Sequence, residues 1–96
     1  NISLCDKQHS DSELLELTDC LLAHPDVVTN VFLGENRLTD ETGVKLARYV
    51  AASSTIEYLD LFNNQLGPAT YQALAAALRV NTSLQGLYLV GNQAED

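Results

Sequence analysis

The chain has 96 residues, which is enough for one domain. Its 13 acidic and 5 basic residues give a net charge of −8, whereas proteins that bind nucleic acid or anionic membranes present a basic surface. No apolar run approaches the length of a membrane span, and no signal-peptide pattern opens the chain. We therefore expect neither nucleic acid nor a membrane as a partner.

The two cysteines, Cys5 and Cys20, are too few for a disulfide framework and suit a reducing compartment as free thiols. This predicts an intracellular, cytoplasmic location. The first residue is Asn1 rather than Met, so we expect a piece of a longer protein or a processed chain. The acidic excess is steepest before residue 42, which fits either a solvated surface or a basic partner.

The first predicted unit covers about residues 1–27. A short strand at Ile2 and Leu4 is followed by a helix whose inward positions have the spacing i, i+3, i+4, i+7. Ser10 or Ser12 can cap this helix, and Pro25 ends it. The inward-facing positions are Leu14, Leu17, Thr18 and Leu21.

The second unit, residues 28–55, has a strand at Val31 and Leu33 and a turn at Asn36. Thr39 or Asp40 caps its helix. Its inward-facing helix positions are Gly43, Leu46, Ala47 and Val50. They correspond one by one to those of the first unit, with Leu14 aligned to Gly43, at an offset slightly longer than the one between the later units.

The third unit, residues 56–83, has a strand from Tyr58 to Phe62 and a sharp turn at Asn64. Pro68 fits the first turn of its helix, where a missing N–H costs little. The expected inward positions of this helix are Tyr71, Leu74, Ala75 and Leu78. A partial fourth unit, residues 84–96, repeats the strand and the turn at Asn92 but stops before a helix.

The units share the pattern L-x-x-L-x-L-x-x-N-x-L, which recurs at equal intervals from Val28 to Ile56 and from Ile56 to Leu84. A fixed period of about 28 residues is typical of stacked repeat proteins. The pattern and the helix motif Leu74-Ala75-x-x-Leu78 resemble the leucine-rich repeat family, in its ribonuclease-inhibitor-like class. The resemblance implies a single α/β domain over residues 1–96. Its expected form is a right-handed βα solenoid with four short parallel strands on the concave face and three helices on the convex face.

Three asparagines at equivalent turns are expected to form a buried ladder, because each amide can bond its own turn and the neighbouring unit. They are Asn36, Asn64 and Asn92. Such stacking buries a common core that no unit could bury alone. The chain's last strand would leave core residues bare, so we expect further repeats or self-association to cover that edge.

Alternate residues of a strand point to opposite faces of a sheet, so the residues between the core leucines should line the concave face. The expected partner-binding residues are Asn30, Phe32, Tyr58, Asp60, Phe62, Tyr88 and Val90. An exposed aromatic cluster usually marks an interface, although strands also favour aromatics that shield their neighbours. Asp60, with Glu35 and Asp6 on the rim, favours a protein partner with a basic patch.

The residues give little support for catalysis, and we expect no enzyme, cofactor or metal site. Cys5 and His9 have no third group that would orient them as a nucleophile pair, and the cysteines and histidines lack zinc-ligand spacing. Two alternatives to a binding module remain. One is activation of a GTPase through Arg37, suggested by the resemblance to Ran GTPase-activating proteins, and the other is a structural segment of a longer repeat protein.

Overall fold

The computed structural model describes residues 2–5 and 7–92. Four strands form one parallel sheet in the order β1-β2-β3-β4. Their bounds are Ile2–Ser3 (β1), Asn30–Phe32 (β2), Tyr58–Asp60 (β3) and Gly86–Tyr88 (β4). A 3₁₀ turn, η1 (Ser12–Leu14), leads into the first of three helices: α1 (Leu15–Ala23), α2 (Asp40–Ala52) and α3 (Pro68–Leu78). The predicted α/β organisation, with four parallel strands and three helices, is confirmed, but the third strand ends at Asp60 rather than Phe62.

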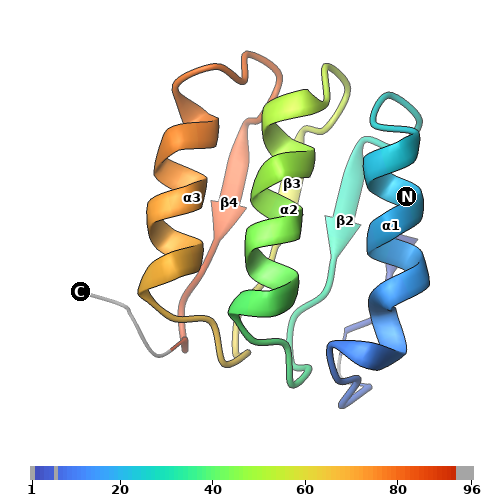
Figure 1. The fold of residues 1–96 in the computed structure, drawn as a ribbon, viewed down its shortest axis with the longest axis vertical. Helices are drawn as coiled ribbons and strands as arrows, with labels where there is room; N and C mark the ends of the chain where they lie inside the picture. The colour runs from blue at the N-terminus through green and yellow to red at the C-terminus, as the bar shows by residue number, and fades with distance from the viewer. Residues whose placement is uncertain (1, 6, 93–96) are drawn as a thin grey trace.

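The molecule has two layers, because the helices lie side by side over one face of the sheet (Figure 1). We call the opposite face of the sheet the strand face. Within the sheet, Val31 pairs with Leu59, and Leu59 pairs with Leu87. Val31 and Leu59 are fully buried and Leu87 is half-buried, so this row faces the helices and forms the core between the layers.

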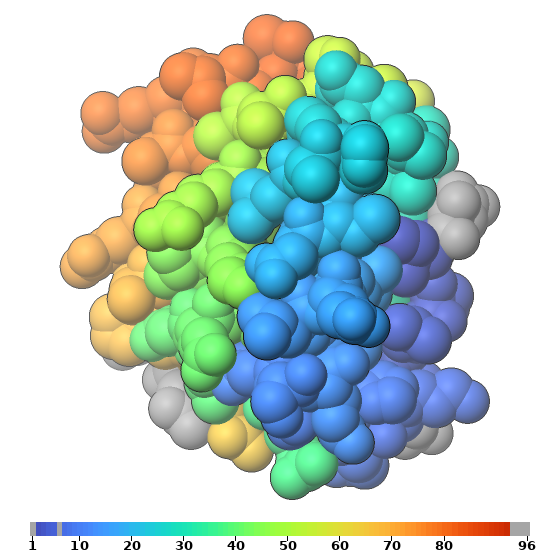
Figure 2. Space-filling model, turned by 45° about the vertical axis from the view of Figure 1, so that its right-hand side comes forward, coloured from blue at the N-terminus to red at the C-terminus, as the bar shows by residue number. Residues whose placement is uncertain are grey.

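The units follow one another in space as they do along the chain. In Figure 2 they cross the surface as successive bands, from α1 in blue through α2 in green to α3 in orange. Neighbouring helices contact each other, α1 with α2 and α2 with α3. Among the residues that the structure describes, no helix combines the length and the apolar character needed to cross a bilayer.

The buried asparagines hold successive strands together where the strands end. Asn64 Nδ2 donates to the carbonyl oxygens of Leu33 and Leu61, and its Oδ1 accepts from Leu38 N at 3.1 Å. Asn36 makes the same kind of backward bonds to the first unit, and Asn92 makes them to the third. Each side chain is at most 6% exposed and satisfies backbone groups of two units.

A second set of polar contacts joins the N-terminal ends of the helices. Asp40, the first residue of α2, accepts hydrogen bonds from Gly67 N at 2.8 Å and from Thr70 N at 3.1 Å, at the start of α3. Asp11 accepts from Thr39 N and from the Thr42 hydroxyl in the same way at the start of α2. In the first two units, one carboxylate therefore caps the helix of the following unit.

The capping expectations are met in part. Thr39 caps α2 by accepting from Glu41 N, and Pro68 occupies the first turn of α3. The expectation that Ser10 or Ser12 caps the first helix is wrong, because Asp11 precedes η1 and Leu14 precedes α1, each without a side-chain cap bond. Ser10 N instead donates to the Glu13 carboxylate.

The inward face predicted for the third helix is also wrong in part. Ala75 and Leu78 are exposed, Leu78 at 45%, and Tyr71 is only half-buried. Their counterparts in α2, Ala47 and Val50, are buried because α3 packs beside α2, whereas the described chain has no helix beyond α3. Tyr49 of α2, which is not among the inward positions expected from the spacing, is fully buried.

Candidate functional site: the strand face

The strand face brings the predicted binding residues into rows across the sheet. Phe32 on β2 is paired with Asp60 on β3, and Asp60 is paired with Tyr88 on β4. A second row joins Asn30, Tyr58 and Gly86. The parallel register therefore places equivalent residues of successive units in direct contact range, as neighbours on adjacent strands about 4.8 Å apart.

The exposure of these side chains rises toward the last strand. Phe32, Tyr58 and Phe62 are half-buried, whereas Tyr88 is 51% exposed and Val90 is 77% exposed. Tyr88 and Val90 thus offer the largest apolar area on this face, and the half-buried ring of Phe32 lies in the same row as Tyr88, on the far side of Asp60. An exposed group of large apolar side chains on one surface is typical of an interaction site.

Two of the aromatic rings have a structural role as well. The Phe62 ring lies over Gly34 of the preceding unit, where an added Cβ would collide with the ring. The Tyr58 ring lies over Gly86 in the same way, and its hydroxyl donates to Gln85 Oε1 at 3.2 Å. These rings cover backbone that glycine leaves bare. Phe62 and Tyr58 therefore shield their own neighbours, which is the alternative to partner binding expected for some strand aromatics.

The charged residues of this face are acidic in the part of the chain that the structure describes. Asp60 is half-buried, and its Oδ1 accepts from Phe62 N at 3.2 Å. Glu35 lies beyond the end of β2 with a φ of 59°, in the left-handed region. Asn63 and Gly91, its equivalents in the next units, share this conformation, so the same turn follows three successive strands. Asp6, expected on the rim, lies outside the described residues.

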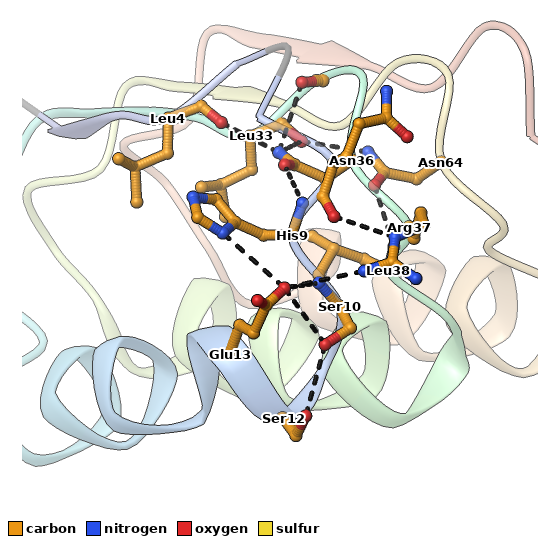
Figure 3. A network of polar contacts seen from close by, with 12 residues as sticks. Leu4, His9, Ser10, Ser12, Glu13, Leu33, Asn36, Arg37, Leu38 and Asn64 are labelled. Carbon is orange, nitrogen blue, oxygen red and sulfur yellow. Dashed lines mark hydrogen bonds and ion pairs between the residues drawn. The ribbon is translucent and has the colours of Figure 1, made fainter.

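Arg37, the candidate for GTPase activation, is held in a contact network between the first two units (Figure 3). Its Nε donates to the Gln8 carbonyl at 2.8 Å, and its guanidinium lies 3.7 Å from the Glu13 carboxylate. The Glu13 carboxylate also accepts from Ser10 N and lies 3.8 Å from His9 Nδ1. The hydrogen bond from Ser10 N, together with the charges of His9 and Arg37, holds the pKa of Glu13 below its ordinary value.

His9 is likewise part of this network rather than part of a paired nucleophile. Its backbone N–H donates to Asn36 Oδ1 at 2.8 Å, and its ring is directed toward Glu13 (Figure 3). Cys5 and Cys20 are free thiols. Over residues 2–5 and 7–92, no group of three or more histidine, cysteine, aspartate or glutamate side chains is placed to hold a metal ion.

Comparison with known proteins finds a similar fold but identifies no family. No protein-family model matches the chain, and no curated protein matches it by sequence. Among solved structures, the one described as "Leiomodin-1 Actin-Binding Site 2 (ABS2)" matches 99% of this chain with a TM-score of 0.84 and 22% sequence identity. The match covers 54% of that chain, so this chain spans about half its length. At this identity the likeness shows a shared fold alone.

Proposed function

We propose that the chain is a segment of a leucine-rich repeat solenoid that binds another protein through its strand face, without catalysis. The observation that carries the proposal is the row formed by Phe32, Asp60 and Tyr88, which places two rings on either side of a carboxylate. In a repeat solenoid this face would be the inner, concave one, where binding surfaces commonly lie. The likeness to an actin-binding site of leiomodin-1 supports a protein partner for this fold.

The rings that cover glycines are less suited to bind than the ones that do not. Phe62 and Tyr58 are already engaged with Gly34 and Gly86, whereas Tyr88 approaches Gly86 only with its hydroxyl and is the more exposed ring. Aromatic residues near the centre of an interface tend to supply much of the binding energy. We therefore assign the main anchor to Tyr88, supported by Phe32 and Val90.

The charge of this face selects the partner's chemistry. Asp60 lies between the two rings and Glu35 lies past the strand end, so a partner with a lysine or arginine next to an apolar side chain would be complementary. We propose an intracellular setting for this interaction on the basis of the two free thiols.

The test is a pull-down from cytosolic extract with the chain and its Tyr88→Ala variant, followed by identification of the proteins lost and by measurement of their affinity with purified partner. Purified actin, tested by cosedimentation, is the first defined partner because of the leiomodin-1 likeness. We expect Tyr88→Ala to weaken the interaction by about 2 kcal/mol, roughly 30-fold.

The matched control is Leu15→Ala, which removes an exposed apolar side chain (41% exposed) from the helical side. It should leave binding unchanged. A partner that Tyr88→Ala and Phe32→Ala both bind as well as the unsubstituted chain does would contradict the proposal. Binding whose salt dependence is the same for Asp60→Ala and the unsubstituted chain would remove the preference for a basic partner.

A further inference from the structure

The helical side of the molecule carries a groove between α2 and α3. Its volume is about 290 Å³ and its walls are almost entirely apolar. Val44, Ala47 and Ala51 line it from α2, and Ala73, Ala76 and Ala77 line it from α3. Arg48 is the one charged residue in this lining.

The preceding pair of helices shows what normally fills this position. The repeat makes Lys45 the counterpart of Ala73 and Tyr49 the counterpart of Ala77, each at the equivalent position of the preceding unit. Tyr49 is fully buried and, as the equivalent of Ala77, belongs to the side of α2 that faces α1. Lys45 Nζ lies 2.9 Å from Asp19 Oδ1 across the two helices. The groove therefore exists because alanines replace a ring and an ion-pairing side chain.

The same alignment of units shows that a charge is left without its partner. Arg48 is the counterpart of Asp19 in the alignment that pairs Leu14 with Gly43, and it faces Ala73 where Asp19 faces Lys45. Arg48 is exposed, and within residues 2–5 and 7–92 it has no ion-pair partner. Helix α3 contains no acidic residue that could take this role.

The groove carries a positive charge although the protein as a whole is acidic. Lys45 is paired with Asp19 and Arg79 lies on the side of α3 away from α2, so the unpaired charge at the groove comes from Arg48. The acidic residues of α2 are confined to its first turn, at Asp40 and Glu41. Arg48 would therefore attract a ligand that carries an acidic group, whereas the partner expected at the strand face is basic.

We propose that the α2–α3 groove is a second docking surface, which binds a helical segment of a partner protein carrying a large apolar side chain and an aspartate or glutamate one turn apart. The apolar side chain would enter between Ala73 and Ala77, where the preceding helix pair has its ring, and the carboxylate would pair with Arg48. A helix fits because an amphipathic helix laid along such a groove offers side chains at i and i+4 on one face. This surface is independent of the strand face.

The test uses two synthetic alanine-rich helical peptides of about 20 residues, since isolated helices shorter than about 12–15 residues are marginal in water. One carries leucine and glutamate at positions i and i+4, and the control peptide has lysine in place of the glutamate. Each is titrated into the ¹⁵N-labelled chain. We expect the acidic peptide to bind about tenfold more tightly than the lysine peptide and to shift the amide signals of Ala47, Ala51, Ala73 and Ala76.

Three variants make the assignment specific. Ala73→Glu gives Arg48 an internal partner, a copy of the Asp19–Lys45 pair with the signs exchanged, and should weaken acidic-peptide binding about tenfold. Arg48→Glu should reverse the preference to the lysine peptide. Arg79→Glu is the matched control, because it makes the same charge change at a position equivalent to Ala51, on the side of α3 away from α2, and should leave the preference unchanged.

The outcomes separate the groove from its alternatives. Equal binding of the acidic peptide to the unsubstituted chain and to Ala73→Glu would overturn the proposal, as would shifts centred on Phe32 and Tyr88. A loss in Arg79→Glu as large as in Arg48→Glu would indicate general attraction to positive charge and would also overturn it. Thermal unfolding of each variant verifies that the fold is retained.

Discussion

The junction between α1 and α2 and the junction between α2 and α3 share one backbone plan but differ in how they are filled. The first holds a buried tyrosine, Tyr49, and a cross-helix ion pair between Asp19 and Lys45. The second has Ala77 and Ala73 at the equivalent positions and a groove between the helices. The repeat thus keeps the backbone geometry, while the side chains decide whether a junction is filled or leaves a groove.

Emptying the first junction should have the largest effect on stability. Tyr49→Ala would leave a cavity at a fully buried position, and we expect a loss of about 4 kcal/mol in the free energy of unfolding. Chemical denaturation measures this loss. Tyr49→Phe is the control and should cost little, because the buried hydroxyl lies near the Ser53 side chain without the geometry of a hydrogen bond. A cost for Tyr49→Ala below about 1 kcal/mol would show that the ring does not close this junction.

The asparagine ladder should be equally strong at both junctions, since the bonds repeat. Asn64→Ala would leave the buried Leu38 N–H unpaired, whereas the carbonyl oxygens of Leu33 and Leu61 would keep the bonds from Asn36 and Asn92, and we expect a loss of about 2 kcal/mol. Asn36→Ala should cost a similar amount, while Gln65→Ala, at an exposed side chain next to Asn64, should cost almost nothing. Unequal losses at Asn36 and Asn64, measured by denaturation, would show that the junctions differ in the sheet edge as well as in the helix layer.

The capping carboxylates make stability depend on pH at both junctions. Burial raises the pKa of Asp11, but hydrogen bonds from Thr39 and Thr42 outweigh it and leave the pKa below its ordinary value. The Thr70 hydroxyl, with Gly67 N and Thr70 N, lowers the pKa of Asp40. Because these pKa values are lower in the folded state, the stabilisation is present above about pH 4 and is lost as the pH falls through the folded-state values.

The corresponding variants test this pH dependence. Asp11→Ala and Asp40→Ala should each cost about 1 kcal/mol at neutral pH, the typical contribution of a helix cap. In thermal unfolding from pH 6 to pH 2, the double variant should lose less stability than the unsubstituted chain. A double variant whose midpoint falls as steeply with acid would show that other carboxylates carry the acid sensitivity.

The ion pair of the first junction should have the smallest effect. Asp19 is largely exposed, so Lys45→Ala should cost less than about 1 kcal/mol, and the cost should shrink further at high salt. Thermal unfolding at two salt concentrations measures it. A larger, salt-independent loss would mean that the Lys45 stem closes the junction by packing rather than by charge.

Much of the fold could be predicted because the apolar residues and turn asparagines recur at regular intervals along the sequence. The regular offset between units predicted the sheet register and the rows on the strand face, since parallel strands place equivalent residues side by side. The helix phase was less predictable. Ala75 and Leu78 have the same spacing as buried residues of α2, but their exposure depends on whether another helix lies beyond α3.

The amino-acid sequence by itself determined the order of strands and helices, the leucine rows and the turn asparagines, because these depend on periodicity along the chain. Only the tertiary structure decided that Asp11 and Asp40 cap the helix of the following unit, that Phe62 and Tyr58 cover glycines, and that Arg48 lies beside an open groove. These contacts join residues from different units, and the spacing of residues within one unit does not specify which groups of the neighbouring unit they will contact.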